Sequence, residues 1–292
     1  MGRLRAAQGI DVEYLALKQM VSVYVGGGTP TSLSEEQFER LMAMTEKYLP
    51  MEQSKEFTVE AGRPDSITEG KLRSMKTHGV TRISINPQSM KEHTLKLLGR
   101  KHTVEEIREK FMLARTLGFD NINMDLIAGL PEETLEDFKE TLREVEALKP
   151  DSITVHTLVI KRASRLRKEQ LEQGGEMREE DACIEPMQKE AEQFCRVHGY
   201  EPYYMYRQKN KAHTTRNTNQ ENVAYAKPGK ECLYNIFIME ELQSILALGS
   251  GGSSKIVFPE ENRMERVENV KSVDDYIGRI DEMIRRKKES WR

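Results

Sequence analysis

A glycine turn after an apolar run is the first feature of the sequence that could do chemistry. Residues 21–31 read VSVYVGGGTPT, in which valines alternate along a predicted strand and then give way to three glycines. Glycine has no Cβ, so its backbone adopts dihedrals that other residues avoid and comes close to a bound ligand. The turn is not a P-loop, because no Lys-Ser/Thr pair follows it, and it does not match the G-x-G-x-x-G dinucleotide turn. It is therefore either a tight structural turn or a binding loop of another kind.

Polar residues stand at the carboxyl ends of several predicted strands. Glu60 closes the second strand, and Gln88 follows the third. Asp125 lies in the fourth strand and His156 in the fifth. In a parallel α/β barrel the carboxyl ends of the strands meet at one face and surround one cavity. Each residue alone also has a structural explanation, such as a strand-end cap, but their shared position in successive strands favours a common site.

Strand and helix patterns alternate from residue 11 to about residue 160 and predict the fold. Predicted strands cover 21–25, 56–61, 81–85, 122–127 and 152–158, and predicted helices cover 11–19, 35–48, 68–78, 103–117 and 133–148. Thr103 with Glu106 forms a capping box, as does Ser34 with Gln37, and Pro150 ends the last of these helices. The alternation predicts right-handed βαβ units and a parallel sheet.

The pattern changes after about residue 160. Further predicted elements are a helix over 178–198, an aromatic strand over 201–208, a polar loop over 209–222 and a last helix capped by Ser272 and Asp275. The RRKK cluster of that last helix is expected to be a solvated end that complements the helix dipole. The predicted domains are residues 1–160, which form the barrel part, and residues 161–292, which form an appendage packed on it.

The bulk composition excludes several classes of protein. The chain has 292 residues and a formal net charge of −3, so nothing favours a general nucleic-acid binder. No run approaches the ~18 apolar residues of a membrane span, and the N-terminal segment has no apolar signal core. Three cysteines, an odd number, suit a reducing cytoplasm better than a disulfide framework. We therefore expect a cytoplasmic protein without a nucleic-acid partner.

An ordered series of motifs resembles one known family. The motifs are YVGGGTPTSL, VEAGRPDSI, RISINPQSM followed by LGRKHT, and NMDLIAGLPEET. Together they resemble radical S-adenosylmethionine (SAM) enzymes, in particular the oxygen-independent coproporphyrinogen III oxidases and the related haem chaperones. ECLYNI and the GSGGSSK turn look most like the HemZ-type coproporphyrinogen dehydrogenase branch. The resemblance implies a partial (β/α)6-type, TIM-like radical SAM barrel that lacks its first strand and carries a C-terminal α+β appendage.

The resemblance also implies which residues bind the cofactor SAM. The glycine turn would meet the methionyl ammonium, and Arg100 would pair with the SAM carboxylate. Glu60 and Asp125 would accept hydrogen bonds from the ribose hydroxyls or the ammonium, Gln88 would hydrogen-bond the ligand, and Ile127 would border the adenine. The full set of predicted SAM-binding residues is Gly27, Gly28, Thr29, Glu60, Gln88, Arg100, Asp125 and Ile127.

The family holds a [4Fe–4S] cluster through a C-x-x-x-C-x-x-C loop, and this chain has no cysteine before Cys183. Cys183 and Cys195 share a predicted helix, which separates them by ~18 Å along its axis, and Cys232 lies elsewhere. We therefore expect no metal ligands in this chain and inert thiols instead. The expectation is a truncated chain, from a fragmentary or split gene or another truncation, that is inactive alone.

The family resemblance implies oxidative decarboxylation of coproporphyrinogen III propionates to vinyl groups, with a tetrapyrrole substrate and an electron-donor protein as partners. The leading alternative is a haem chaperone of the same fold. Two further alternatives are an inactive remnant and an unrelated barrel enzyme that uses Glu60 and Asp125 as acid and base. Candidate axial haem ligands are His156, His198, His213 and Cys232, and candidate substrate-binding residues are Arg63, Arg162, Arg165, Arg207, Tyr203, Tyr204 and Tyr206.

Overall fold

The computed structural model describes residues 20–158, 184–207, 221–241 and 243–291, without the side chains of Arg207 and Glu221. These residues form two compact units. The first unit contains the described residues up to Tyr24, Glu35–Phe57 and the described residues from Cys232 onward, and the second contains Val25–Ser34 and the described part of Thr58–Glu231. The predicted helix 11–19 and the predicted domain boundary near residue 160 lie outside the described residues, so both stay predictions.

The main sheet has seven strands in the order β1-β2-β3-β4-β5-β7-β6. The strands are β1 (Ser22–Val25), β2 (Glu56–Gly62), β3 (Arg82–Gln88), β4 (Ile122–Ala128), β5 (Ser152–Thr157), β6 (Glu201–Arg207) and β7 (Glu221–Ala226). Strands β2 to β5 pair in parallel, which confirms the predicted α/β fold. Strand β7 pairs antiparallel with β5 and with β6, so these two strands continue the sheet and do not stand apart from it.

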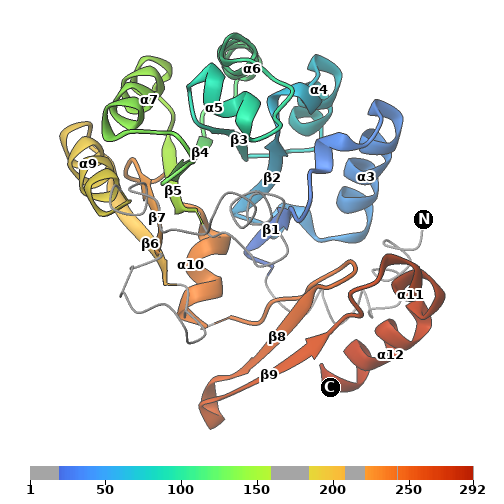
Figure 1. The fold of residues 1–292 in the computed structure, drawn as a ribbon. Coiled ribbons are helices and arrows are strands. Elements are labelled where there is room, and N and C mark those ends of the chain that lie inside the picture. Colours follow the sequence, from blue (N-terminus) through green and yellow to red (C-terminus); the bar gives the residue numbers. More distant parts are fainter. Residues whose placement is uncertain (1–19, 159–183, 208–220, 242, 292) are drawn as a thin grey trace, which may run out of the picture. The chain divides into compact units, whose positions relative to one another are not determined.

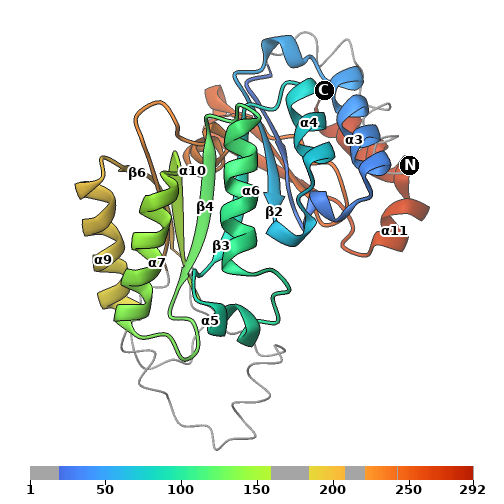
Figure 2. The same ribbon diagram turned by 90° about the horizontal axis from the view of Figure 1, so that it is seen from above.

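Helices follow the parallel strands of the second unit in the predicted order. They are α4 (Glu69–Thr77), α5 (Glu92–Leu97), α6 (Val104–Thr116), α7 (Leu135–Leu148) and α9 (Ile184–Val197). Figures 1 and 2 show α4, α6, α7 and α9 along the outer side of the curved sheet. The predicted capping box of Thr103 and Glu106 is confirmed at the start of α6. Helix α5 was not predicted, because a six-residue helix is too short to show a helical period.

The described part of the first unit contains four α-helices and a hairpin. They are α3 (Glu35–Tyr48), α10 (Leu233–Glu240), α11 (Val273–Gly278), α12 (Ile280–Ser290), β8 (Ser253–Phe258) and β9 (Arg263–Glu268). The predicted last helix is two helices, and Arg279 is the residue between them. Its terminal cluster is not wholly solvated, because Lys287 is buried and its ammonium donates to the Asn269 side chain. Burial lowers the pKa of Lys287 to about 8.

Three other differences from the sequence prediction concern β7, α10 and β9. The described end of the predicted loop 209–222 is the start of β7, so the loop prediction is wrong at residues 221 and 222. Helix α10 was not predicted from the sequence. Its apolar residues lie all around the helix, so they show no amphipathic period. Strand β9 is mostly exposed on both faces, so it lacks the alternation that identifies a half-buried strand.

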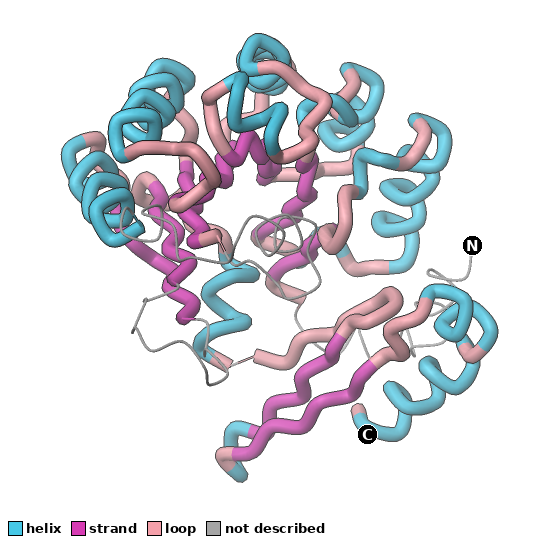
Figure 3. The backbone as a smooth tube through the Cα atoms, in the orientation of Figure 1, coloured by secondary structure: helices cyan, strands magenta, loops and turns pink. Residues whose placement is uncertain are grey.

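Each parallel strand of the second unit has an apolar outer face and a polar inner face. On β4 the side chains of Met124, Leu126 and Ala128 are fully buried, as are Phe138, Leu142 and Val145 of α7. Burial of such side chains contributes about 1.5–3 kcal/mol each for the larger ones. The alternate residues on the strands are polar and include Thr58, Ser84, Asn123 and Thr154. Helices therefore cover one face of the sheet (Figure 3), and the other face is left for a polar site.

None of the helices in the described ranges is long and apolar enough to cross a bilayer.

We predict that Gly129→Ala destabilises the second unit. Gly129 has φ +81° directly after β4, and a Cβ there would lie 2.6 Å from Cγ1 of Ile184 on α9. The strained backbone and the overlap together should cost about 3 kcal/mol of unfolding free energy. Denaturant unfolding of the variant and the parent chain measures the loss.

Gly118→Ala is the matched control for this prediction. Gly118 also has a positive φ, +85°, but a Cβ there meets nothing within 4 Å. This variant should lose only about 1 kcal/mol from the left-handed backbone. Equal losses in the two variants would contradict a packing role for Gly129 against α9.

Candidate functional site

The carboxyl ends of β2 to β5 bring most of the predicted site residues to one face of the second unit. Asp125 and Ile127 are two residues apart on β4, so they point to the same face. Ile127 pairs with His156 on β5, and Asp125 pairs with Thr154. Glu60 on β2 pairs with Ser84 on β3, which pairs with Asn123 on β4. Because neighbouring strands are about 4.8 Å apart, the backbones of β2 and β4 are about 10 Å apart, and Asp125 lies two residues beyond the register partner of Glu60.

The glycine turn lies beside Glu60. The backbone N–H of Gly27 donates to Oε2 of Glu60 over 3.2 Å. Gly27 and Gly28 have φ values of +78° and +81°, so the turn needs the left-handed conformation that glycine adopts easily. A Cβ at either position would meet nothing within 4 Å, which leaves open space above this backbone. The turn therefore presents bare backbone to that space.

Hydrogen bonds fix the residues that follow the turn. The Thr31 hydroxyl donates to the Ala61 carbonyl over 2.5 Å and lies 2.6 Å from the Ser66 hydroxyl. The buried Lys71 ammonium donates to the Thr31 carbonyl over 2.6 Å. Thr29 begins the short 3₁₀ helix Pro30–Ser32, and its Cγ2 would lie 3.1 Å from a Cβ at Gly62. The turn is thus anchored to β2 and to the start of α4.

Strands β2 and β3 are both irregular at their carboxyl ends. The register shifts between Glu60 and Gly62, and again between Ile85 and Gln88. Gln88 has φ +71°, which is unusual for a residue with a side chain. Backbone strain of this kind costs about 1–3 kcal/mol and is concentrated at functional sites. The structure therefore places the predicted residue Gln88 in a strained conformation at the carboxyl-terminal edge of β3. This edge of β2 to β5, together with the glycine turn, is called the rim below.

Asp125 and His156 form the main ion pair of the inner face. Oδ2 of Asp125 lies 3.8 Å from Nε2 of His156, and Oδ1 accepts from the Asn123 side chain over 2.6 Å. Burial opposes ionisation of Asp125, but His156, Asn123 and Arg82 outweigh it and lower the pKa of the carboxyl. Burial likewise opposes protonation of His156, but Asp125 outweighs it and raises the pKa of the imidazole. The pair is therefore held in its charged form.

Arg100 lies near the end of β2, beside Arg63, Asp65 and His102. Burial is the main effect that lowers the pKa of Arg100, and the Arg63 charge adds to it. Arg63 is already paired with Asp65 at 2.5 Å, and the His102 ring lies 3.5 Å from the same carboxylate. Across the described ranges, the Arg100 guanidinium has neither a hydrogen bond nor an ion pair. A half-buried cation without a carboxylate is a natural site for an anionic group of a ligand.

Several buried polar atoms on the inner face have no protein partner. They are the hydroxyls of Thr58 and Ser84 and the amide oxygen of Asn86, considering only the part of the chain that the structure describes. Buried polar atoms in folded proteins are almost always hydrogen-bonded. Their number on one face fits a polar ligand at this position. The apolar side chain of Ile127 lies on the same face and is half-buried.

Sequence reasoning missed the residues that support Asp125. Asn123 holds the carboxylate, Arg82 lowers its pKa, and Thr154 donates to Asn123 over 3.1 Å. A signal was present, since RISIN, INMDLI and SITVHT alternate polar and apolar residues. That alternation indicates strands with one polar face, and not strands buried on both faces. Among the predicted site residues, Glu60 accepts from the Gly27 amide, and Asp125 and Ile127 share one face of β4. The roles of all predicted residues as SAM ligands stay predictions.

The cysteines in the described ranges are buried. Burial raises the pKa of the Cys195 thiol to about 12, so it forms the metal-binding thiolate poorly. The Cys232 thiol is also buried and donates to Oε1 of Glu56 over 3.5 Å. No group of three His, Cys, Asp or Glu residues within the described ranges is arranged to hold a metal ion. Cys183 lies outside these ranges, and no described residue is assigned to an iron–sulfur cluster.

Comparison with known proteins identifies the family. Residues 11–145 match the family model described as the Radical SAM superfamily. The oxygen-independent coproporphyrinogen-III oxidase-like protein HemZ of Bacillus subtilis strain 168 is 44% identical over 264 residues, which cover 90% of this chain and 51% of HemZ. Heme chaperone HemW of Escherichia coli strain K12 is 28% identical over 250 residues, which cover 86% of this chain and 60% of HemW. The chain thus spans about half the length of HemZ.

A solved structure has the same fold. Coproporphyrinogen III oxidase (HemN) from Escherichia coli, described as a radical SAM enzyme, aligns with a TM-score of 0.67. The alignment covers 97% of this chain and 64% of that protein at 21% sequence identity, and it shows the fold alone. The predicted resemblance and fold class are confirmed by these comparisons. Whether a further strand precedes β1 stays a prediction.

We predict that the stabilising effect of His156 depends on pH. The pKa of His156 is raised in the folded state, so its contribution is complete below its ordinary value of about 6.5 and is lost as the pH rises through the raised value. The pKa of Asp125 is lowered, so the contribution of Asp125 is present above about 3.9 and is lost at lower pH. The parent chain should therefore have a higher free energy of unfolding than His156→Gln. The difference should be largest where Asp125 is ionised and His156 is protonated, between about pH 3.9 and the raised pKa of His156.

Denaturant unfolding at several pH values between about 5 and 9 tests this prediction. The difference between the parent chain and His156→Gln should shrink toward high pH. Asp125→Asn provides the matched background, because adding His156→Gln to it should give a difference that varies much less with pH. A difference that is the same at all pH values in the parent background would contradict the ion pair.

Proposed function

The chain carries a radical SAM domain over residues 11–145, and on that basis we propose that the rim of the second unit binds SAM. The observation that carries the proposal is the half-buried Arg100, which forms no ion pair within the described ranges, since the nearby Asp65 is already paired with Arg63. Arg100 lies near Arg63 and Asp65, which follow β2, and Glu60 of the same strand accepts from the Gly27 amide of the glycine turn. A cation, a carboxylate and bare backbone amides on one rim suit a ligand that carries both an ammonium and a carboxylate.

The groups on the rim match the groups of SAM one by one. In this proposal Glu60 and the turn of Gly27, Gly28 and Thr29 hold the methionyl ammonium, and Arg100 pairs with the carboxylate. Asp125 accepts from the ribose hydroxyls, since its charged form is maintained by His156. Gln88 hydrogen-bonds the ligand and Ile127 borders the adenine. Unpartnered polar atoms at Ser84 and Asn86 support a polar occupant.

When bound, SAM together with a reduced iron–sulfur cluster would supply the radical chemistry of the family. The residues of this chain would bind and orient SAM and exclude water from it. Glu60 and Arg100 would fix the methionyl end at two points, which restricts its rotation. Asp125 would fix the ribose at a third point on a different strand. The described residues assign no ligand to the cluster, so no step is derived through it.

We further propose that the substrate is a tetrapyrrole and that the reaction is oxidative decarboxylation of coproporphyrinogen III propionates to vinyl groups. Similarity to HemZ over 90% of the chain supports this proposal. Among the predicted substrate-binding residues, Arg63 is neutralised by Asp65, so it is a weaker candidate for a propionate. Tyr203 and Tyr204 are half-buried and Tyr206 is exposed on β6. Arg162 and Arg165 lie outside the described residues, as does the Arg207 side chain.

Other parts of the prediction remain to be tested. An electron-donor protein, the lack of a nucleic-acid partner and a cytoplasmic location stay predictions. Inactivity of the chain alone also stays a prediction. Formation of 5′-deoxyadenosine by the anaerobically reduced chain would contradict that inactivity.

The SAM proposal predicts that Arg100→Ala weakens SAM binding about tenfold to a hundredfold. Loss of a charged hydrogen-bonded contact costs about 1.5–3 kcal/mol. Arg100→Lys should retain part of the affinity, because it keeps the charge but loses the planar pair of donors. Isothermal titration calorimetry of SAM with the purified chain measures each dissociation constant.

Arg73→Ala is the matched control for Arg100→Ala. Arg73 is exposed on α4 and pairs only with Glu69, four residues before it, among the contacts shown for the described chain. Its replacement should leave the dissociation constant unchanged. If the parent chain binds SAM and Arg100→Ala binds it equally well, the assignment of Arg100 is wrong. If the parent chain binds no SAM, the proposed function is wrong for this chain.

A haem-binding chaperone is the second candidate function. Relatives named Heme chaperone HemW support it, and so does the half-exposed His156 whose Nε2 faces Asp125. A histidine held by a carboxylate on one ring nitrogen is the usual arrangement for a metal ligand. His198 is a weaker candidate, since it lies 3.4 Å from Glu146 and its ring lies tilted against the ring of Phe194. His213 lies outside the described residues, and Cys232 is fully buried.

The haem-chaperone candidate predicts a Soret band when haem is added to the parent chain. His156→Ala should weaken haem binding about tenfold or more, because it removes a ligand to iron, and His198→Ala should leave it unchanged. Absorbance titration measures both affinities. Haem binding that survives in His156→Ala would remove His156 from this role.

A further inference from the structure

We propose that Glu133 and Ser89 are positioning residues that hold Gln88 in its strained conformation at the ligand rim. The proposal rests on the proposed SAM site, because Gln88 is one of its predicted ligands. It concerns a different segment, the PEET sequence before α7, to which the sequence analysis assigned no role. The relevant residues all belong to the second unit.

The conformation of Gln88 needs support from outside its own strand. Gln88 has φ +71°, and its side chain makes this conformation unfavourable. The register shift between Ile85 and Gln88 shows that the strand carries an extra residue there, which interrupts the regular ladder with β4. Strained backbone persists only where surrounding contacts over-determine it. The contacts that do so should therefore lie in the residues that follow Gln88.

Hydrogen bonds tie the two residues after Gln88 to Glu133 and to α7, and a third bond closes a local turn between Ser89 and Lys91. The Ser89 hydroxyl donates to Oε1 of Glu133 in a short hydrogen bond. The Met90 backbone N–H donates to the Thr141 hydroxyl over 3.2 Å. The Lys91 backbone N–H donates back to the Ser89 hydroxyl, also over 3.2 Å. The chain therefore cannot rotate freely directly after Gln88.

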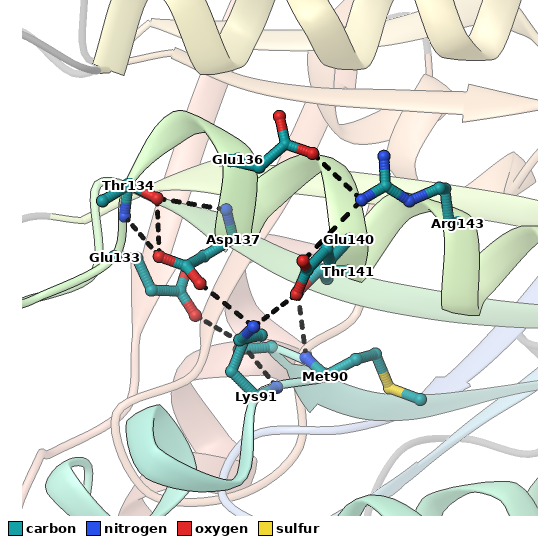
Figure 4. A network of polar contacts seen from close by, with 10 residues as sticks. Met90, Lys91, Glu133, Thr134, Glu136, Asp137, Glu140, Thr141 and Arg143 are labelled. Atoms are coloured by element: carbon teal, nitrogen blue, oxygen red, sulfur yellow. Dashed lines mark hydrogen bonds and ion pairs between the residues drawn. The ribbon is translucent and has the colours of Figure 1, made fainter.

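The Lys91 side chain adds a second attachment to the same helix (Figure 4). Its ammonium lies 3.0 Å from Oδ1 of Asp137 and forms a short contact with Glu140. Asp137 is itself fixed by a capping box with Thr134, whose hydroxyl hydrogen bond is the main reason that the pKa of Asp137 is lowered to about 2. Because Asp137 stays charged over the whole ordinary pH range, this attachment does not depend on pH.

Glu133 differs from the other acids of this network because it is buried. Only 4% of its surface is exposed, whereas the side chains of Glu136 and Glu140 are 62% and 46% exposed. Burial raises the pKa of its carboxyl group, and the Ser89 and Thr94 side chains oppose this shift. Burial of a carboxyl group is costly unless it is fully hydrogen-bonded. The capping box of α7 uses Thr134 and Asp137 and not Glu133, so the role of the buried Glu133 lies in its bond to Ser89 and its contact with Thr94.

The hydrogen bond between Ser89 and Glu133 joins the loop after β3 to the loop after β4. Glu133 follows β4, the strand of Asp125, and Ser89 follows β3, the strand of Gln88. Their hydrogen bond therefore fixes the end of one strand relative to the end of the next. Removing it should allow Gln88 to leave the left-handed conformation, and the fraction of molecules with a competent site should fall. Apparent affinity falls in proportion to that fraction.

The test is the dissociation constant of SAM, measured by calorimetry for the parent chain and a set of variants. Glu133→Ala should weaken binding about tenfold, since release of the strain favours other conformations of Gln88. Glu133→Gln should bind within about twofold of the parent, because its amide oxygen still accepts from Ser89. Glu136→Ala is the matched control, since Glu136 lies in the first turn of α7, is exposed and pairs with Arg143 at 3.0 Å. It should bind SAM like the parent.

A second variant and a second measurement keep the test decisive if Glu133→Ala folds poorly. Thr141→Val preserves the volume of a buried side chain but removes the acceptor for the Met90 amide. It should weaken SAM binding in the same direction, and hydrogen exchange of the Met90 amide should accelerate in both variants. Loss of thermal stability without a change in SAM affinity would show a merely structural role and overturn the proposal. Absence of SAM binding in the parent chain would instead refute the proposed function and this inference with it.

Discussion

The alternation of polar and apolar residues along β2 to β5 is the constraint on which the second unit depends. Apolar residues such as Met124 and Leu126 must face the helices, because that is where their surface is removed from water. The intervening residues are then forced to the opposite face, whatever their chemistry. In this chain they are Thr58, Ser84, Asn123 and Thr154, with Glu60, Asp125 and His156 on the same faces. The same alternation therefore packs one face of the sheet against the helices and places the polar site residues on the opposite face.

The charges on that face are balanced in two different ways. Asp125 and His156 balance each other, and each shifts the pKa of the other so that both remain charged. Arg100 is half-buried and forms no ion pair within the described ranges, because the nearby Asp65 is already paired with Arg63. A site with one internal pair and one uncompensated cation has a preference for an anionic group at a defined point. This difference separates a binding rim from an ordinary network of surface ion pairs.

Positive φ angles occur where the strands reach this rim. Gly27, Gly28 and Gly62 adopt positive φ angles, and so does Gln88 despite its side chain. Helices α6 and α7, which come after β3 and β4 in the chain, begin with regular capping boxes at Thr103 and Thr134. The strands are thus regular and tightly packed over most of their length, and strained backbone follows their carboxyl ends. Such a division is common where rigid elements position residues on loops for binding.

The sequence by itself determined the order of strands and helices, the glycine turn and the strand-end positions of Glu60, Gln88 and Asp125. These features depend on periodicity and capping, which act over a few neighbouring residues and can be read along the chain. Only the tertiary structure decided that β7 pairs with β5, that Lys287 is buried and that Glu133 meets Ser89 across 44 residues. Those outcomes depend on which distant segments become neighbours and how much water they exclude. Short apolar or polar segments such as α10 and β9 carry too weak a period for that choice to be visible in the sequence.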